Sequence, residues 1–337
     1  MSGHGPRTLR VREVVQETAD ACSIVFEEPA LAYRPGQFLT LRIPSEQVAT
    51  ARCYSLSSSP HVDSLLTVTV KRSVDGYASN WLCDNVAPGT ELEVLPPAGL
   101  FTPQDLSANL LLFAGGSGIT PVMSIVKSAL AQGSNTVVLI YANRDDSSVI
   151  FAAQLAALSR QHPKRFLVHH WFESVQGLPS VEQLAALARP YLTYDVFVCG
   201  PGPYMDAVEK AMATIGATHV HLERFVSLGG DPFAAPVQQV MVQDGPTATV
   251  HVELDGQLHE LAWPTGSKLL DVLLAQGLDA PYSCREGNCS ACGCKLLEGQ
   301  VSMLANQVLE QQDLDDGWIL ACQSLPVSAV VKVSYDY

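Results

Sequence analysis

The chain has few charged and few aromatic residues, and it has no long apolar run. Charged residues make up 16% of the 337 residues and aromatic residues 7%. A transmembrane helix needs about 18 or more consecutive apolar residues, and the sequence contains no such stretch. The first residues also lack the apolar segment that a secretory signal requires. These absences predict a cytoplasmic protein that does not associate with a membrane.

Positive charge is scarce as well. The chain carries 20 Lys and Arg residues against 34 Asp and Glu residues, which gives a net charge of −14. A nucleic-acid-binding protein normally presents a basic surface, so we expect no nucleic-acid partner. The hydrophobic share of 47% is enough to fill buried cores. At about 100–200 residues per domain, the length predicts two or three domains.

The cysteines do not form a disulfide pattern. Their number, nine, is odd and their spacing is uneven, which argues against a disulfide framework and favours reduced thiols. Five of them lie among the last 100 residues, a part that carries 13 acidic and 4 basic residues. This acidity is either ordinary solvation or a docking face for a basic partner. The same two interpretations apply to an acidic run made of Glu310, Asp313, Asp315 and Asp316.

Three kinds of pattern follow one another along the chain. Residues 8–101 hold short alternating or β-branched runs between turn residues, which predicts an antiparallel β-barrel. Residues 107–225 alternate apolar runs with helical stretches, which predicts an α/β domain around a parallel sheet. Near the end, two alternating runs flank Asp255-Gly256, which is a strong hairpin signal. The predicted modules are 1–105, 106–228 and 242–337, with a linker over 229–241.

The sharpest motif is a group of four cysteines, which are Cys284, Cys289, Cys292 and Cys322. Their spacing is the C-x4-C-x2-C…C pattern of plant-type [2Fe-2S] sites. Small residues around them, including Gly287 and Gly293, allow backbone N–H groups to approach cluster sulfurs. A zinc site and inert buried thiols are the alternatives, although structural zinc usually pairs two C-x2-C knuckles. Cys294 is expected to be a core thiol.

Two glycine-rich turns follow predicted strands. The first is Ala114-Gly-Gly-Ser-Gly-Ile-Thr-Pro121, which opens a helix, and the second is Cys199-Gly-Pro-Gly-Pro203. Glycines permit close backbone approach, and a helix N-terminus favours an anion such as a pyrophosphate. The first turn alone could equally be a simple strand–helix connection. Two such turns at the carboxyl ends of parallel strands make a nucleotide crevice more credible.

Two shorter patterns carry weaker signals. In Arg52-Cys-Tyr-Ser55, the Arg suits a phosphate, the Tyr a flat ring and the Ser a ring nitrogen, although an exposed strand end is an equally simple interpretation. Arg144 follows the second strand of the α/β part, where an adenosine ribose would lie. Its neighbours Asp145 and Asp146 would repel a 2′-phosphate, which favours NADH over NADPH.

Together these motifs, in this order, resemble the phthalate-dioxygenase-reductase-like branch of the ferredoxin–NADP reductase superfamily. Members join a flavin-binding barrel, a nicotinamide-nucleotide domain and a C-terminal β-grasp ferredoxin in one chain. Within that branch, the chain resembles the reductase components of 3-ketosteroid 9α-hydroxylases. The stretches that look most alike are Tyr33–Pro44, Asp75–Asp84, Tyr141–Asp146 and Val308–Asp315.

The resemblance implies a role for each matching residue. It implies FAD, NADH and a [2Fe-2S] cluster as cofactors, and the four cysteines of the motif as cluster ligands. Ser55, Cys199 and Glu223 would be catalytic, with Ser55 beside the flavin and Cys199 beside the nicotinamide. The residues that would hold the flavin and the dinucleotide are Arg52, Tyr54, Ser55, Lys71, Gly76, Ser79, Gly115, Gly116, Gly118, Thr120, Pro121, Arg144, Gly200 and Phe225.

The implied activity is transfer of electrons from NADH through FAD and the cluster to a Rieske-type terminal oxygenase that hydroxylates a steroid. Three alternatives remain open at this stage. The acceptor could be another oxygenase system, acting on phenylacetyl-CoA, an alkane or an aromatic ring. The chain could instead be a non-enzymatic redox-sensing module or a zinc-bound binding module.

Overall fold

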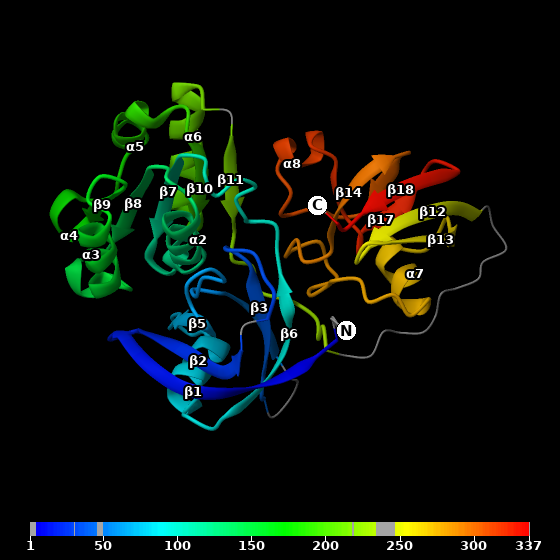
Figure 1. The fold of residues 1–337 in the computed structure, drawn as a ribbon, viewed down its shortest axis with the longest axis horizontal. Coiled ribbons are helices and arrows are strands. Elements are labelled where there is room, and N and C mark those ends of the chain that lie inside the picture. The colour runs from blue at the N-terminus through cyan, green and yellow to red at the C-terminus, as the bar shows by residue number, and fades with distance from the viewer. Residues whose placement is uncertain (1–4, 30, 46–49, 218, 234–246, 337) are drawn as a thin grey trace.

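The structure is a computed structural model that describes residues 5–336 except 30, 46–49, 218 and 234–246. Three large sheets follow one another along the chain, each in a separate lobe, and the third lobe also holds a two-stranded sheet of β15 and β17 (Figure 1). Strands β1–β6 form the first lobe, β7–β11 the second and β12–β18 the third. No helix in the described part of the chain is both long enough and apolar enough to cross a membrane.

The first lobe is an antiparallel six-stranded sheet with the strand order β4-β3-β6-β1-β2-β5. An antiparallel bridge between Leu56 and Val68 connects its two edges, so the sheet closes into a barrel. Apolar side chains that alternate along the strands, such as Leu39 and Leu41, fill its interior. The elements are β1 (Arg7–Thr18), β2 (Ala21–Pro29), β3 (Phe38–Ile43), β4 (Thr50–Ser55), β5 (Leu65–Lys71), α1 (Tyr77–Asn85) and β6 (Glu91–Ala98).

The second lobe is a parallel five-stranded sheet with the order β11-β10-β7-β8-β9. Separate apolar clusters cover its two faces, one built with α2 and α3 and the other with α5 and α6. This is the doubly wound arrangement expected from the alternation of strands and helices. The strands are β7 (Leu110–Gly115), β8 (Val137–Asn143), β9 (Phe166–Phe172), β10 (Asp195–Cys199) and β11 (Val220–Glu223). The α-helices are α2 (Ile119–Gln132), α3 (Ala152–Gln161), α4 (Glu173–Gln176), α5 (Val181–Ala188) and α6 (Gly202–Ile215).

The third lobe packs α7 against a mixed sheet with the order β13-β12-β18-β14-β16. Strands β12 and β18 run parallel while their neighbours are antiparallel, as a β-grasp requires. The strands are β12 (Thr247–Leu254), β13 (Gln257–Pro264), β14 (Gly293–Glu298), β15 (Val301–Met303), β16 (Trp318–Leu320), β17 (Ser324–Pro326) and β18 (Val330–Ser334). The two helices are α7 (Leu269–Ala275) and α8 (Gln311–Asp315).

Most expected elements are confirmed. The runs Phe38–Ile43 and Leu65–Lys71 are strands with those bounds. The predicted hairpin turns at Asp255 and Gly256, both with positive φ, as a tight two-residue turn needs. Helix α1 interrupts the part of the chain for which only strands were expected. The predicted module boundaries at 105/106 and 228/229 fall between sheets, while that at 241/242 lies outside the described residues.

Candidate functional site

A cavity of about 540 Å³ opens between the barrel and the second lobe. Strand β4 supplies one wall, through Arg52, Tyr54 and Ser55, and Phe225 from the segment after β11 supplies another. Eight of the predicted site residues line this cavity: Arg52, Tyr54, Ser55, Lys71, Gly76, Ser79, Thr120 and Phe225. The structure therefore brings together residues that are far apart in the sequence, as the flavin motif requires.

The N-terminus of α1 faces the same cavity. Its N-cap residue, Gly76, forms no side-chain cap, so the first N–H groups of the helix are not occupied by a side chain of the N-cap. A Cβ on Gly76 would lie 2.7 Å from the Cβ of Ser73, which explains why glycine stands here. The Ser79 hydroxyl accepts a hydrogen bond from the Ser73 N–H at 3.0 Å and fixes the turn. Exposed helix N–H groups bind phosphate oxygens well, so this cradle fits a flavin phosphate.

A second cavity, of about 530 Å³, lies at the carboxyl ends of the parallel strands. Gly115, Gly116, Arg144 and Lys71 are among the residues that line it. The Tyr204 hydroxyl, at its wall, is buried and has no hydrogen-bond partner among the described residues. A buried unpartnered hydroxyl in a mostly apolar cavity fits a ligand that combines flat rings with polar groups, as a dinucleotide does.

Other predicted residues of the glycine turns do not line either cavity. A Cβ on Gly118 would lie 2.1 Å from the carbonyl oxygen of Cys199, and one on Gly200 would lie 3.0 Å from the N–H nitrogen of Gly115. These glycines let the two turns touch, so their effect on a ligand is through the shape of the turns. Pro121 and Cys199 are buried in the core of the lobe.

Several residues that line the second cavity belong to none of the motifs found in the sequence. Trp171 and Tyr204 line its wall, and Glu173 begins α4 directly after β9. Trp171 lies near the end of β9, and nothing in the sequence around it indicated that its ring would line a cavity. Asp145, in contrast, turns away from the cavity, because its carboxylate accepts hydrogen bonds from Ser147 and Ser148.

The four predicted cluster ligands converge in the third lobe. The thiol of Cys284 contacts those of Cys289 and Cys322, and the thiol of Cys322 also contacts that of Cys292. All four are buried, with exposed fractions of at most 7%. Positive φ values at Arg285, Gly287 and Ser290 curl the loop around them.

Backbone N–H groups point at these sulfur atoms. The N–H groups of Glu286 and Asn288 donate to the Cys284 sulfur, both at 3.3 Å, and the N–H of Cys322 donates to the Cys292 sulfur at 3.4 Å. Donors aimed at sulfur stabilise thiolates and tune the potential of iron–sulfur centres. No group of three or more His, Cys, Asp or Glu side chains in the described chain is arranged to hold a single metal ion. Four buried cysteines with the plant-type spacing, whose sulfur atoms accept hydrogen bonds from backbone N–H groups, fit a binuclear cluster.

The cluster loop packs directly against the barrel. The hydroxyls of Thr40 on β3 and Ser283 before the loop are 2.7 Å apart, and both side chains are buried. A crevice of only about 20 Å³ separates β4 from the loop, and it is lined by Cys53, Ser55 and Cys289, among others. Because Cys53 and Ser55 also line the larger cavity, strand β4 borders both the flavin cavity and the cluster loop.

Glu223, at the end of β11, lines that crevice without lining the flavin cavity. Burial raises the pKa of its carboxyl to about 8, so it holds its proton at neutral pH. Cys199 and Cys53 are close enough for Glu223 to raise the pKa of both thiols, although burial is the main cause in each case.

The acidic run is not simply a solvated loop. Asp313 and Glu310 line a crevice shared with Arg224 and His221 of β11 and the residues that follow it. Burial raises the pKa of Glu310, and the Asp313 carboxylate accepts a hydrogen bond from the Glu310 N–H at 2.9 Å. Part of the acidity of the third lobe therefore faces the second lobe, not solvent.

Fold and sites together define a class: a flavin- and dinucleotide-binding reductase that carries its own iron–sulfur module. Family models agree, with an oxidoreductase FAD-binding domain over 8–102, an oxidoreductase NAD-binding domain over 112–210 and a 2Fe-2S iron-sulfur cluster binding domain over 252–327. The chain is 56% identical over 344 residues to the ferredoxin reductase component of 3-ketosteroid-9-alpha-monooxygenase from Rhodococcus rhodochrous, with 98% of each chain covered. It belongs to the family of ferredoxin reductase components of 3-ketosteroid-9-alpha-monooxygenases.

Further relatives show how widely this architecture is shared. The chain is 34% identical over 353 residues to a component of the 1,2-phenylacetyl-CoA epoxidase of Escherichia coli, with 98% of this chain and 97% of that one covered. Its fold matches phthalate dioxygenase reductase with a TM-score of 0.60 at 23% identity, over 98% of both chains. It also matches the cytochrome P450 CYP116B46 of Tepidiphilus thermophilus with a TM-score of 0.68 at 24% identity, where 97% of this chain spans 42% of the longer one.

Proposed function

We propose that this protein is the reductase component of a 3-ketosteroid 9α-hydroxylating monooxygenase. It would take electrons from NADH and pass them through FAD and the [2Fe-2S] cluster to a Rieske-type terminal oxygenase. The relatives that support this substrate class are 55–56% identical over nearly their whole length, against 34% for the phenylacetyl-CoA relative.

The observation that carries the electron-transfer part is the position of β4. Its residues Cys53 and Ser55 border the flavin cavity on one side and the crevice to Cys289 on the other. When bound, a flavin accepts an electron pair from a nicotinamide and an iron–sulfur cluster takes up single electrons. The chain would keep the two centres close and exclude water between them, since that crevice is barely larger than one water molecule.

Within this proposal each side chain has one task. Arg52 would neutralise a flavin phosphate, and Tyr54 would lie along the flavin ring. Ser55 would donate a hydrogen bond beside the reacting nitrogen. Glu223, protonated at neutral pH, would hold a proton at its carboxyl near the nicotinamide and flavin without adding a buried negative charge.

The N-terminus of α1, with Gly76 and Ser79, would hold the FAD pyrophosphate, with Thr120 at the opposite wall. Gly115 and Gly116 would receive the pyrophosphate of the dinucleotide, and Gly118, Pro121 and Gly200 would shape that turn. Cys199 would lie behind the nicotinamide. The four cysteines of the loop would each donate one thiolate, two to each iron.

The preference for NADH is also proposed. Glu173 lines the dinucleotide cavity at the end of β9, where a carboxylate would accept hydrogen bonds from a ribose and repel a 2′-phosphate. Measuring kcat/KM with both coenzymes tests it. Equal values, or a preference for NADPH, would contradict the proposal.

The test of the whole function is reconstitution with candidate oxygenase components. We expect NADH-dependent 9α-hydroxylation of a 3-ketosteroid with the steroid oxygenase, and rates at least about 10-fold lower with oxygenases of the phenylacetyl-CoA, alkane or aromatic-ring type. Reduction of an artificial dye by NADH serves as the control, because it needs no oxygenase. If the dye is reduced and only a non-steroid oxygenase is supported, the electron-transfer part stands and the steroid assignment is wrong.

A further inference from the structure

A cluster of charges lies where the barrel meets the dinucleotide cavity. Lys71, at the end of β5, and Arg144, after β8, both line that cavity. Lys71 also lines the flavin cavity, and its Nζ lies 3.5 Å from the position that a Cβ on Gly116 would take. Two cations at this place are suited to attract the phosphates of a dinucleotide, including a 2′-phosphate if one is present.

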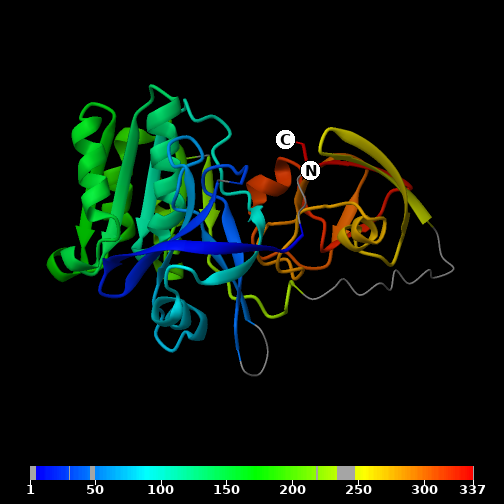
Figure 2. The same ribbon diagram turned by 60° about the horizontal axis from the view of Figure 1, so that its bottom comes forward.

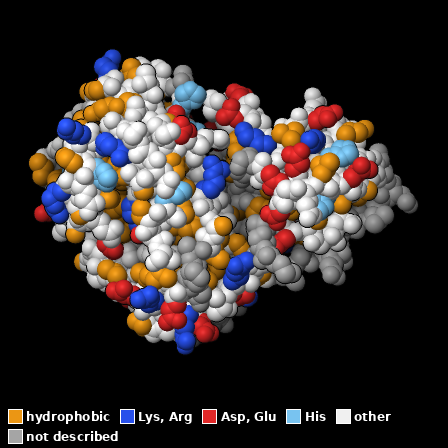
Figure 3. All heavy atoms as spheres, in the orientation of Figure 1, with side chains coloured by type: hydrophobic (Ala, Val, Ile, Leu, Met, Phe, Trp, Pro, Cys, Tyr) orange, Lys and Arg blue, Asp and Glu red, His pale blue; other side chains and the backbone are white. Residues whose placement is uncertain are grey.

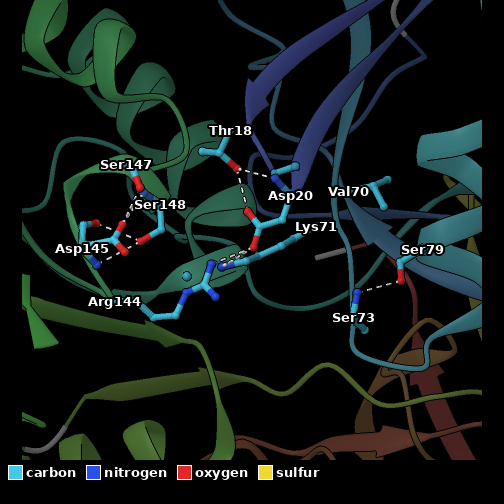
Figure 4. A network of polar contacts seen from close by, with 12 residues as sticks. Thr18, Asp20, Val70, Lys71, Ser73, Ser79, Arg144, Asp145, Ser147 and Ser148 are labelled. Atoms are coloured by element: carbon cyan, nitrogen blue, oxygen red, sulfur yellow. Dashed lines mark hydrogen bonds and ion pairs between the residues drawn. The ribbon is translucent and has the colours of Figure 1, made fainter. Parts of the chain in front are cut away.

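Both cations are already paired with a carboxylate of the barrel. Asp20, in the turn between β1 and β2, places one carboxylate oxygen 2.9 Å from the Arg144 guanidinium and 3.9 Å from the Lys71 ammonium (Figure 4). No acidic side chain of the second lobe forms a described ion pair with Arg144.

Asp20 is held in this position by its own turn. The Thr18 hydroxyl donates to the second carboxylate oxygen of Asp20 at 2.8 Å, and the Arg72 N–H donates to its backbone carbonyl at 2.8 Å. The Asp20 side chain is 28% exposed, whereas that of Arg144 is 63% exposed. A partly buried acid, held by its own turn, thus pairs with a more exposed base.

The acidic residues next to Arg144 in the sequence, Asp145 and Asp146, form no described ion pair with its guanidinium. The Asp145 carboxylate bonds to the Ser148 N–H at 2.9 Å and to the Ser147 hydroxyl at 2.8 Å, within its own turn (Figure 4). Asp146 is exposed and takes part in no ion pair among those described. Among the described ion pairs, Asp20 of the barrel is the acid that contacts both Arg144 and Lys71, whereas Asp145 attracts these two cations without forming an ion pair with either.

We propose that Asp20 is a specificity-determining residue, which favours NADH over NADPH by neutralising Arg144 and Lys71 at the dinucleotide cavity. This inference rests on the proposed use of NADH. A 2′-phosphate adds about two negative charges near neutral pH. Asp20 repels those charges and occupies the guanidinium that would otherwise bind them, while the two phosphates common to both coenzymes still have the glycine turn. Removing the carboxylate should therefore help NADPH more than NADH.

The experiment compares Asp20→Asn with Asp146→Asn in the holoenzyme. Both variants remove one negative charge near Arg144, but only the first breaks the ion pair. We expect Asp20→Asn to raise kcat/KM for NADPH about 10-fold and that for NADH less than about 3-fold, with kcat at saturating NADH unchanged. Asp146→Asn should change the ratio of the two values less than about 2-fold.

Two further measurements separate selectivity from general damage. Binding of NADP⁺ and NAD⁺ to the oxidised holoenzyme, followed by calorimetry, should show the same change in ratio without any turnover. The double variant Asp20→Asn/Arg144→Gln should return the ratio to within about 3-fold of wild type, since no unpaired guanidinium remains. Asp20→Ser, which also removes the charge, replaces Asp20→Asn if that variant does not retain FAD.

The outcomes are distinguishable. If the wild-type protein uses NADPH as well as NADH, the proposed coenzyme is wrong. If the wild type prefers NADH but Asp20→Asn and Asp146→Asn change the ratio equally, or Asp20→Asn leaves it unchanged, the role of Asp20 is overturned and the NADH proposal stands.

Discussion

The barrel has two neighbours, and it meets them in different ways. Its contact with the nucleotide lobe combines apolar packing of Ala21 and Phe101 with polar pairs. Asp63 and Lys127 form an ion pair at 2.6 Å, and the buried hydroxyls of Ser59 and Ser128 are 2.7 Å apart. The flavin cavity, of about 540 Å³, lies along this contact, and the dinucleotide cavity, of about 530 Å³, lies beside it. A coenzyme that must enter and leave in every cycle needs such open space.

Its contact with the ferredoxin lobe is closed. Apolar residues from both sides, including Phe38 and Ala291, bury the proposed cluster ligands Cys284 and Cys289, and the remaining crevice is about 20 Å³. Figure 2 shows the third lobe lying beside the barrel from a second direction. The open side of the barrel therefore leaves room for a ligand to enter and leave. The closed side holds the cluster loop at a fixed, short distance from β4.

The largest effect that would test this difference is loss of the cluster. Cys289→Ser should abolish the cluster absorption and its paramagnetic signal, and lower reduction of the oxygenase at least about 100-fold. Transfer from NADH to the flavin should change less than about 3-fold, because it takes place on the other side of the barrel. Stopped-flow absorbance measures both steps.

Cys294→Ala is the matched control for that variant. Cys294 is also a buried cysteine of the third lobe, but it lies on β14, where its thiol interacts with Tyr335 and packs in the core. The Cys294→Ala variant should therefore retain the cluster. Oxygenase reduction at the wild-type rate in Cys289→Ser would mean that electrons bypass the cluster.

A smaller effect is expected from the buried hydroxyl pairs. Thr40→Val removes the hydroxyl that lies nearest to the Ser283 hydroxyl at the closed contact, at a cost of about 1–3 kcal/mol. We expect flavin-to-cluster transfer to slow about 10-fold and hydrogen exchange in the cluster loop to speed up, with NADH-to-flavin transfer unchanged.

The counterpart at the open contact is Ser128→Ala, which removes the hydroxyl that pairs with Ser59. It should affect NADH-to-flavin transfer and leave flavin-to-cluster transfer unchanged. Thr40→Ser, which keeps the hydroxyl, should restore most of the rate lost in Thr40→Val. If both variants slow the same step, the two contacts do not have separate tasks.

Salt should distinguish the surface of the ferredoxin lobe from these internal contacts. On the face seen in Figure 3, acidic side chains gather on that lobe, whereas basic side chains are spread over the other two lobes. Raising ionic strength from about 50 to about 300 mM should lower oxygenase reduction a few-fold, if the acceptor presents a basic face. Dye reduction by NADH is the control. If the rate of oxygenase reduction does not change with ionic strength, the acidic side chains of this lobe interact with solvent and do not dock the acceptor.

The smallest effect concerns Glu223 and pH. Because burial raises the pKa of Glu223 to about 8, the native state holds this proton in a pH range where the unfolded chain releases it. Stability should therefore fall as pH rises from about 5 to about 8 and then level off. Glu223→Gln removes the ionisable carboxyl and with it this pH dependence. Between pH 5 and pH 8, the Tm of the variant should therefore rise by about 3 °C relative to that of the wild type. The exposed Glu298, as Glu298→Gln, should show no such gain.

The sequence predicted the local features well because they depend on local chemistry. The cysteine spacing predicted a loop that curls around a cluster, and the Asp255-Gly256 turn predicted its hairpin. Alternation of apolar residues predicted the barrel strands, since side chains on a strand point alternately inward and outward. Helix α1 was missed because its nine residues include polar Ser, Asn and Asp and lack a strong apolar stripe.

What the sequence determined is therefore the order of the modules, most of their strands and helices, and the residues of each motif, since each depends on neighbours within a few positions. Which motifs line the same cavity follows only from how the lobes pack against one another. It placed Asp20 of the barrel on Arg144 of the nucleotide lobe, and Thr40 on Ser283, across 124 and 243 positions of chain. Such pairs form because packing of whole lobes brings their surfaces together, and no local pattern encodes that contact.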